Sequence, residues 1–67
     1  MNRKPKEQPL PLGEQIRAAR TARDLTQAEL GEMVGLPQTA IHGIERHGAY
    51  AKGVEIVDKI RRLLGIV

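Results

Sequence analysis

The chain has 67 residues, no cysteine, a single aromatic residue and a formal net charge of +3. A domain of this size buries only about 60% of its unfolded surface, so a deep enclosed active site is not expected, and the lack of cysteine excludes disulfides and thiolate zinc sites. One tyrosine offers no stacking platform for single-stranded bases, whereas the positive charge suits a polyanion without identifying it.

The N-terminal segment, residues 1–9, contains Arg3, Lys4 and Lys6 together with two prolines. It has almost no apolar side chains, so we expect a mobile basic arm ahead of one domain over residues 10–67. Such an arm can wrap a duplex or enter a groove, although a solubilising tail has the same composition. No signal peptide is recognisable and no run approaches the roughly 18 apolar residues of a membrane span, so we expect a cytoplasmic protein.

The first predicted helix follows Pro11, which suits a first helical turn. Its expected core face repeats at spacings of four, three and four, with Leu12, Ile16, Ala19 and Arg23. We expect this helix to run to about Arg23.

The second predicted helix has the strongest local start signal. Thr26 and Glu29 have the spacing of a capping box, in which the hydroxyl caps the helix and the acid reaches back to the cap residue. Leu25 and Leu30 flank them as a hydrophobic staple. We therefore expect a helix that begins at Gln27 and lasts about eight residues.

Two more helices complete the pattern. Gly35 permits the left-handed conformation that ends a helix, and Pro37 can open the next one, which Gly48 can close. The apolar face expected for this third helix is Ala40, Ile41 and Ile44. A fourth stripe, ended by Gly65, consists of Val54, Val57, Ile60 and Leu64, with Ile56 and Leu63 beside them. Since no alternating strand pattern occurs, the predicted fold class is all-α with four helices.

The corner between the second and third helices is the most informative feature. Two short helices joined by a tight turn containing glycine, with the second helix amphipathic, are typical of a helix-turn-helix. Gly31 favours this interpretation, because a side chain there would hold the two backbones apart, and glycine inside a helix costs about 1 kcal/mol relative to alanine. An ordinary αα-hairpin would show the same break.

The stretch LGEQIRAARTARDLTQAELGEMVGLPQTAIHGIERHG, residues 12–48, resembles the Cro and phage-repressor type of helix-turn-helix, often called Xre-like; residues 54–65 resemble it more loosely. The resemblance rests on LTQAEL, Gly31, VGL at the corner, and Ile41 with Ile44 and Glu45. It implies a compact lambda-repressor-like bundle of four or five helices whose third helix, about 37–46, lies in the DNA major groove.

The same resemblance implies base-reading positions near the start of the third helix, which fall on Gln38, Thr39, His42 and Gly43. Gln38 can pair bidentately with adenine, and Thr39 can offer its hydroxyl to any base or its methyl to thymine. His42 suits a base edge, a phosphate or a solvated surface. Gly43 offers only a close backbone approach.

Phosphate contacts are expected mostly from outside the helix-turn-helix, because residues 26–48 contain one arginine against three glutamates. The resemblance gives Gln27 a phosphate contact. The cationic candidates are Arg17, Arg23, Arg46 and Lys52, together with Arg3, Lys4 and Lys6 of the arm. The resemblance also pairs Arg20 with Glu45, although base rates alone favour two solvated charges.

The predicted function is a sequence-specific double-stranded DNA-binding transcriptional regulator, a repressor encoded by a bacterium or a phage. We expect no enzyme, because serine, cysteine and a phosphate-binding glycine loop are absent. We expect no metal site, since His42 and His47 do not share a helix face. We also expect no cofactor and no small-molecule ligand. A protein-interaction module such as an antitoxin or regulatory subunit remains the alternative.

A single domain of this size contacts one half-site, so we expect a homodimer on a palindromic operator. The tail LLGIV, residues 63–67, would either form the dimer interface or cover the small core.

Overall fold

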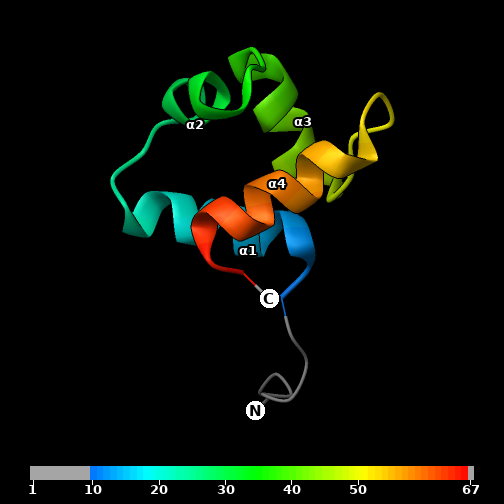
Figure 1. The fold of residues 1–67 in the computed structure, drawn as a ribbon. Helices are drawn as coiled ribbons and strands as arrows, with labels where there is room; N and C mark the ends of the chain where they lie inside the picture. Colours follow the sequence, from blue (N-terminus) through cyan, green and yellow to red (C-terminus); the bar gives the residue numbers. More distant parts are fainter. Residues whose placement is uncertain (1–9, 67) are drawn as a thin grey trace.

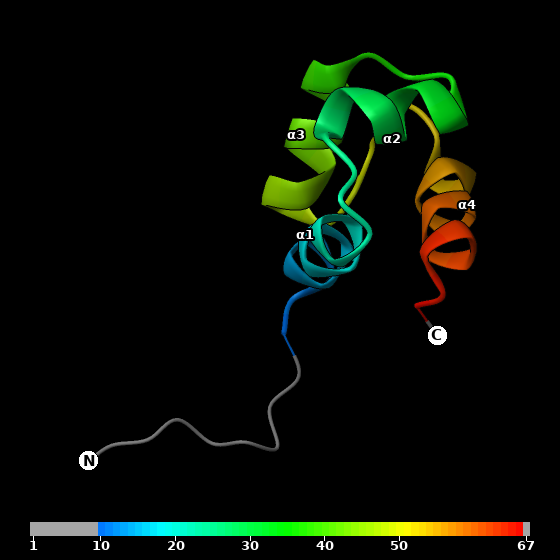
Figure 2. The ribbon, with the colours of Figure 1, turned by 90° about the vertical axis from the view of Figure 1, so that its left-hand side faces the viewer.

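The computed structural model describes residues 10–66, which form four helices and no strand. In chain order these are α1 (Leu12–Ala22), α2 (Gln27–Val34), α3 (Gln38–His47) and α4 (Val54–Leu64). α1 and α2 each pack against both α3 and α4, and α2 lies above α1 and α4 in both views (Figure 1, Figure 2). The all-α prediction is confirmed, with no fifth helix in the part of the chain described.

The predicted arm with Arg3, Lys4 and Lys6, and the last residue Val67, lie outside the described residues. Within residues 10–66 no helix is long and apolar enough to cross a bilayer.

The capping box at the start of α2 is confirmed. The Thr26 hydroxyl accepts a hydrogen bond from the Glu29 N–H at 3.0 Å, and the Thr26 N–H donates to Glu29 Oε1 at 2.8 Å. Leu30 is fully buried and Leu25 packs against the core, as a hydrophobic staple requires. α2 therefore begins at Gln27 because two of its otherwise unpaired donors are satisfied there.

The core is small and entirely aliphatic. Its buried side chains come from all four helices: Ile16, Leu30, Val34, Ile41, Ile44, Val57, Ile60 and Leu64. Tyr50, in the loop between α3 and α4, is half-buried and packs against this cluster. Burial of these groups supplies the main favourable contribution to folding.

Three residues expected on or beside core faces are exposed instead, among them Leu63 on α4, which is 39% exposed. Val54 is 74% exposed because it is the first residue of α4, one turn before Val57 reaches the other helices. Arg23 is exposed because α1 ends at Ala22, so Arg23 no longer follows the helical face. Arg20 occupies the buried position on that face instead.

Two glycines allow α3 to approach its neighbours closely. A Cβ on Gly31 of α2 would overlap the carbonyl oxygen of Leu36 in the turn, as the sequence predicts. A Cβ on Gly13 of α1 would overlap the carbonyl oxygen of Glu45 in α3. Both contacts are with backbone, which cannot move aside like a flexible side chain, so glycine is required at both positions.

Candidate nucleic-acid interface

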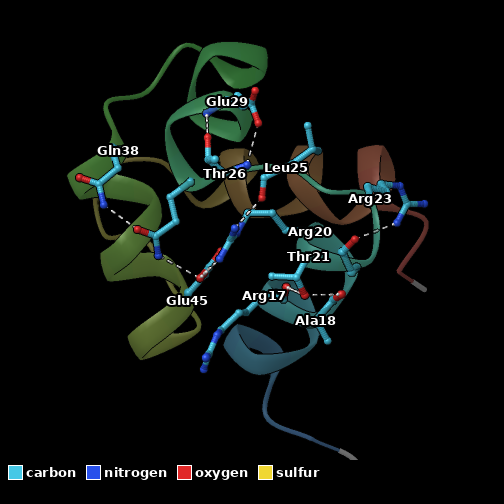
Figure 3. A network of polar contacts seen from close by, with 12 residues as sticks. Arg17, Ala18, Arg20, Thr21, Arg23, Leu25, Thr26, Glu29, Gln38 and Glu45 are labelled. Atoms are coloured by element: carbon cyan, nitrogen blue, oxygen red, sulfur yellow. Dashed lines mark hydrogen bonds and ion pairs between the residues drawn. The ribbon is translucent and has the colours of Figure 1, made fainter.

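A buried ion pair joins α1 to α3. Arg20 Nε donates to Glu45 Oε2 at 2.6 Å, and Arg20 Nη2 donates to Glu45 Oε1 at 3.3 Å (Figure 3). Only 11% and 5% of the two side chains are exposed, so these are not solvated charges. Arg20 Nη1 also donates to the Leu25 carbonyl at 2.6 Å, which ties the same guanidinium to the segment before α2.

Two glutamine amides extend this network to the surface. Gln27 Nε2 donates to Glu45 Oε1 at 3.0 Å, and Gln38 Nε2 donates to Gln27 Oε1 at 2.6 Å. Gln38 is exposed, and its carbonyl oxygen points away from the network in Figure 3. A continuous set of hydrogen bonds therefore runs from a buried arginine to an exposed amide.

The positions of both glutamines follow from the helix starts. Gln27 is the first residue of α2, after the Thr26 cap, and Gln38 is the first residue of α3, after Pro37. The first N–H groups of a helix lack intrahelical acceptors and carry the positive end of the helix dipole. The two amides therefore stand beside backbone donors that favour an anion.

Cationic side chains gather next to this network. A surface depression is lined by Gln27 and Glu45 together with the exposed Arg17, His42 and Arg46. It joins side chains from α1, α2 and α3, and its exposed charges are positive. The structure thus brings four of the predicted contact residues to one place: Arg17, Gln27, His42 and Arg46.

The other predicted contact residues are more dispersed. Thr39 is exposed on α3, and Lys52 is exposed in the loop that follows α3. Arg23 lies apart from Gln38, on the other side of the network in Figure 3, where its Nη1 donates to the Ala19 carbonyl at 3.2 Å.

Gly43 is the one base-reading candidate without a side chain. It is half-buried on α3, and a Cβ placed on it would meet nothing within 4 Å. The fold therefore does not require glycine at this position, unlike Gly13 and Gly31.

A family model described as helix-turn-helix matches residues 16–67. The chain belongs to the Cro/C1-type helix-turn-helix family. The family is one of DNA-binding regulators and is generally non-enzymatic, so the chain is a DNA-binding helix-turn-helix domain. Comparisons with curated proteins and with solved structures found no match.

Of the three glutamates in the helix-turn-helix, Glu45 is buried, whereas Glu29 and Glu32 are exposed. Glu45 is paired with Arg20, and Glu29 accepts from the Thr26 N–H in the capping box. Counting charges along the sequence therefore overstates the repulsion that a polyanion meets on this domain. Arg17 and Arg46, by contrast, remain exposed to a ligand.

Two features of the structure are missing from the sequence-based prediction. One is the close contact at Gly13, although its spacing of three and four with Ile16 and Arg20 places it on the buried face of α1. The other is the hydrogen bond between Gln27 and Gln38, for which the sequence carries no direct signal. Within residues 10–66, no three acidic or histidine side chains gather into a metal site.

Proposed function

We propose that the protein is a sequence-specific transcriptional repressor that inserts α3 into the major groove of double-stranded DNA. The observation that carries the proposal is the Gln38 amide, which is exposed in the first turn of α3 and held there by Gln27. The major groove admits an α-helix, and helix-turn-helix proteins address base edges from the N-terminal part of the inserted helix. An amide in that position carries the donor and the acceptor that complement adenine.

The other base contacts would come from the same exposed side of α3. We assign the Thr39 hydroxyl to a hydrogen bond with a base, or its methyl group to contact with a thymine methyl. His42, one helical turn after Gln38, is assigned to a base edge or a phosphate. Gly43 would let the DNA approach the helix backbone, since nothing in the fold occupies the space beside it. These roles give α3 one strong base-reading residue and three weaker contacts.

Phosphate contacts would surround this helix. Arg17, Gln27 and Arg46 line the depression beside α3 and suit the phosphates flanking the groove. Lys52, in the loop after α3, and the arm residues Arg3, Lys4 and Lys6 extend the cationic surface further. Arg23 would reach DNA only by leaving its contact with the Ala19 carbonyl.

We further propose that two copies bind a palindromic operator. One such domain covers a half-site, and tight specific binding generally uses two domains about one helical turn apart. Ile66 packs against the core, which supports a covering role for that residue of the tail. Leu63 is 39% exposed on α4 and is the better candidate for contact with a second copy.

The test is selection of bound duplexes from a random-sequence library, with affinity for an unselected duplex measured against salt concentration. We expect an enriched palindromic motif and a steep negative slope of log K against log salt, about 0.9 per phosphate contact. The alternative protein-interaction module would give neither. Gln38→Ala should reduce discrimination at one base pair of each half-site by about 1 to 3 kcal/mol, whereas a uniform loss across sequences would contradict its role.

A further inference from the structure

Asp24, in the turn between α1 and α2, has an unusual backbone conformation. Its φ is 56°, the one positive φ of a residue other than glycine in the part of the chain that the structure describes. The Leu25 N–H donates to the Arg20 carbonyl at 3.1 Å, and the Asp24 N–H donates to the Thr21 carbonyl at 3.0 Å. This is the pattern of a helix end that glycine usually closes. A carboxylate there also stands at the negative end of the α1 dipole, so the fold itself does not favour aspartate at this position.

The Asp24 side chain lines a surface depression of about 590 Å³ beside the start of α2. Gln27 and Ala28 of α2 and Gln38 of α3 share this lining. Arg20, the other ionisable residue there, is buried and paired within the fold. Among the described residues of the depression, Asp24 therefore carries the one exposed charge, and that charge is negative.

The start of α2 is suited to an anion. Thr26 accepts from the N–H groups of Glu29 and Leu30, both at 3.0 Å. The N–H groups of Gln27 and Ala28 come before these in the first turn, where a helix offers no acceptor. Free donors and the positive end of the α2 dipole together favour a phosphate, which the proposed function places beside Gln27.

We infer that the Asp24 carboxylate repels the DNA phosphate that approaches the start of α2, and so lowers the affinity of the domain for every duplex. The inference rests on the proposed insertion of α3 into the major groove. Because a phosphate carries no sequence information, Asp24 changes the overall affinity and not the preference among bases. Its charge opposes the attraction that Arg17 and Arg46 supply from the other depression. Asp24 thereby limits binding to DNA that lacks the operator, which is almost entirely electrostatic.

The decisive variant is Asp24→Asn. Asparagine tolerates the same left-handed conformation and carries no charge. We expect it to tighten binding to a selected operator and to a random duplex by similar factors, about threefold or more at about 50 mM salt. The gain should shrink at about 200 mM salt, because the repulsion acts across solvent and is screened. Fluorescence anisotropy of a labelled duplex measures each affinity.

Two further variants isolate the effect of the charge. Asp24→Gly removes both the charge and the backbone strain, so it should match Asp24→Asn in affinity. Glu55→Gln makes the same change of net charge at an exposed position of α4, which lies across the domain from α3 (Figure 2). It should leave duplex affinity nearly unchanged. Thermal melting followed by circular dichroism establishes that each variant is folded.

The outcomes separate the inference from the proposed function. Equal tightening by Asp24→Asn and Asp24→Gly, beyond that of Glu55→Gln, supports the inference. Tightening by Asp24→Gly alone would reveal a backbone effect and overturn it. If Asp24→Asn binds no tighter than Glu55→Gln, the inference fails, and operator selection by the unaltered protein leaves the proposed function standing. Absence of duplex binding by both the unaltered protein and Asp24→Asn would overturn the proposed function together with the inference.

Discussion

α3 and α4 are amphipathic helices of 10 and 11 residues, but their polar side chains make different kinds of contact. Both bury aliphatic side chains in the same core. The polar side of α3 is joined to α1 and α2 through Glu45 and Gln38, whereas the side-chain ion pair on α4 is Arg61 with Asp58, at 3.3 Å and within the helix itself. Burial is enough to place a helix, but cross-linking by directional hydrogen bonds also sets the orientation of its exposed groups.

The largest expected effect comes from breaking the buried connection. Arg20→Ala should lower the free energy of unfolding by about 3 to 5 kcal/mol, because it leaves the Glu45 carboxylate buried without its partner. Asp58→Ala, which removes the exposed pair on α4, should change it by only about 0.5 kcal/mol. Urea denaturation followed by circular dichroism measures both, and equal losses would show that the two helices are held alike.

A smaller loss is expected where α1 meets the backbone of α3. Gly13→Ala should lower the free energy of unfolding by about 1 to 3 kcal/mol, because the methyl group overlaps the Glu45 carbonyl oxygen and forces the helices apart. The displacement should also weaken DNA binding, since it moves Glu45. Thermal melting and duplex titration test this, and an unaltered melting temperature would mean that α1 and α3 can separate freely.

A small gain in stability is expected on the open side of α3. Gly43→Ala should raise the free energy of unfolding by about 0.5 to 1 kcal/mol, because alanine favours a helix and nothing lies beside this position. If DNA approaches the backbone there, the same methyl group should weaken specific binding. A more stable variant with unchanged affinity would show that DNA does not approach Gly43. A less stable variant would show that the space beside this position is not open.

The helix boundaries could be predicted because their causes are local. Thr26 and Glu29 are three residues apart, and Gly35 ends α2 through its own backbone conformation, with φ of 77°. The exposure of Val54 was missed because a periodic stripe does not reveal where the neighbouring helices end. Local sequence signals therefore predict where a helix begins and ends better than they predict which of its residues contact other helices.

Prediction of the candidate site depended on contacts between residues that are far apart in the sequence. The pairing of Arg20 with Glu45, 25 residues apart, is implied by the family resemblance and not by spacing. The hydrogen bond from Gln38 to Gln27 joins two helix starts whose separation is set by the turn between them, so it required the three-dimensional structure. The clash at Gly13 likewise depends on how closely two helices pack.

Tyr50 gives this protein a built-in optical reporter. It is the only aromatic side chain, and it packs half-buried against the core from the loop between α3 and α4. Because no tryptophan is present to accept its excitation energy, the intrinsic fluorescence arises from one known position. Displacement of that loop, two residues before Lys52, therefore changes a single emission signal without any attached dye.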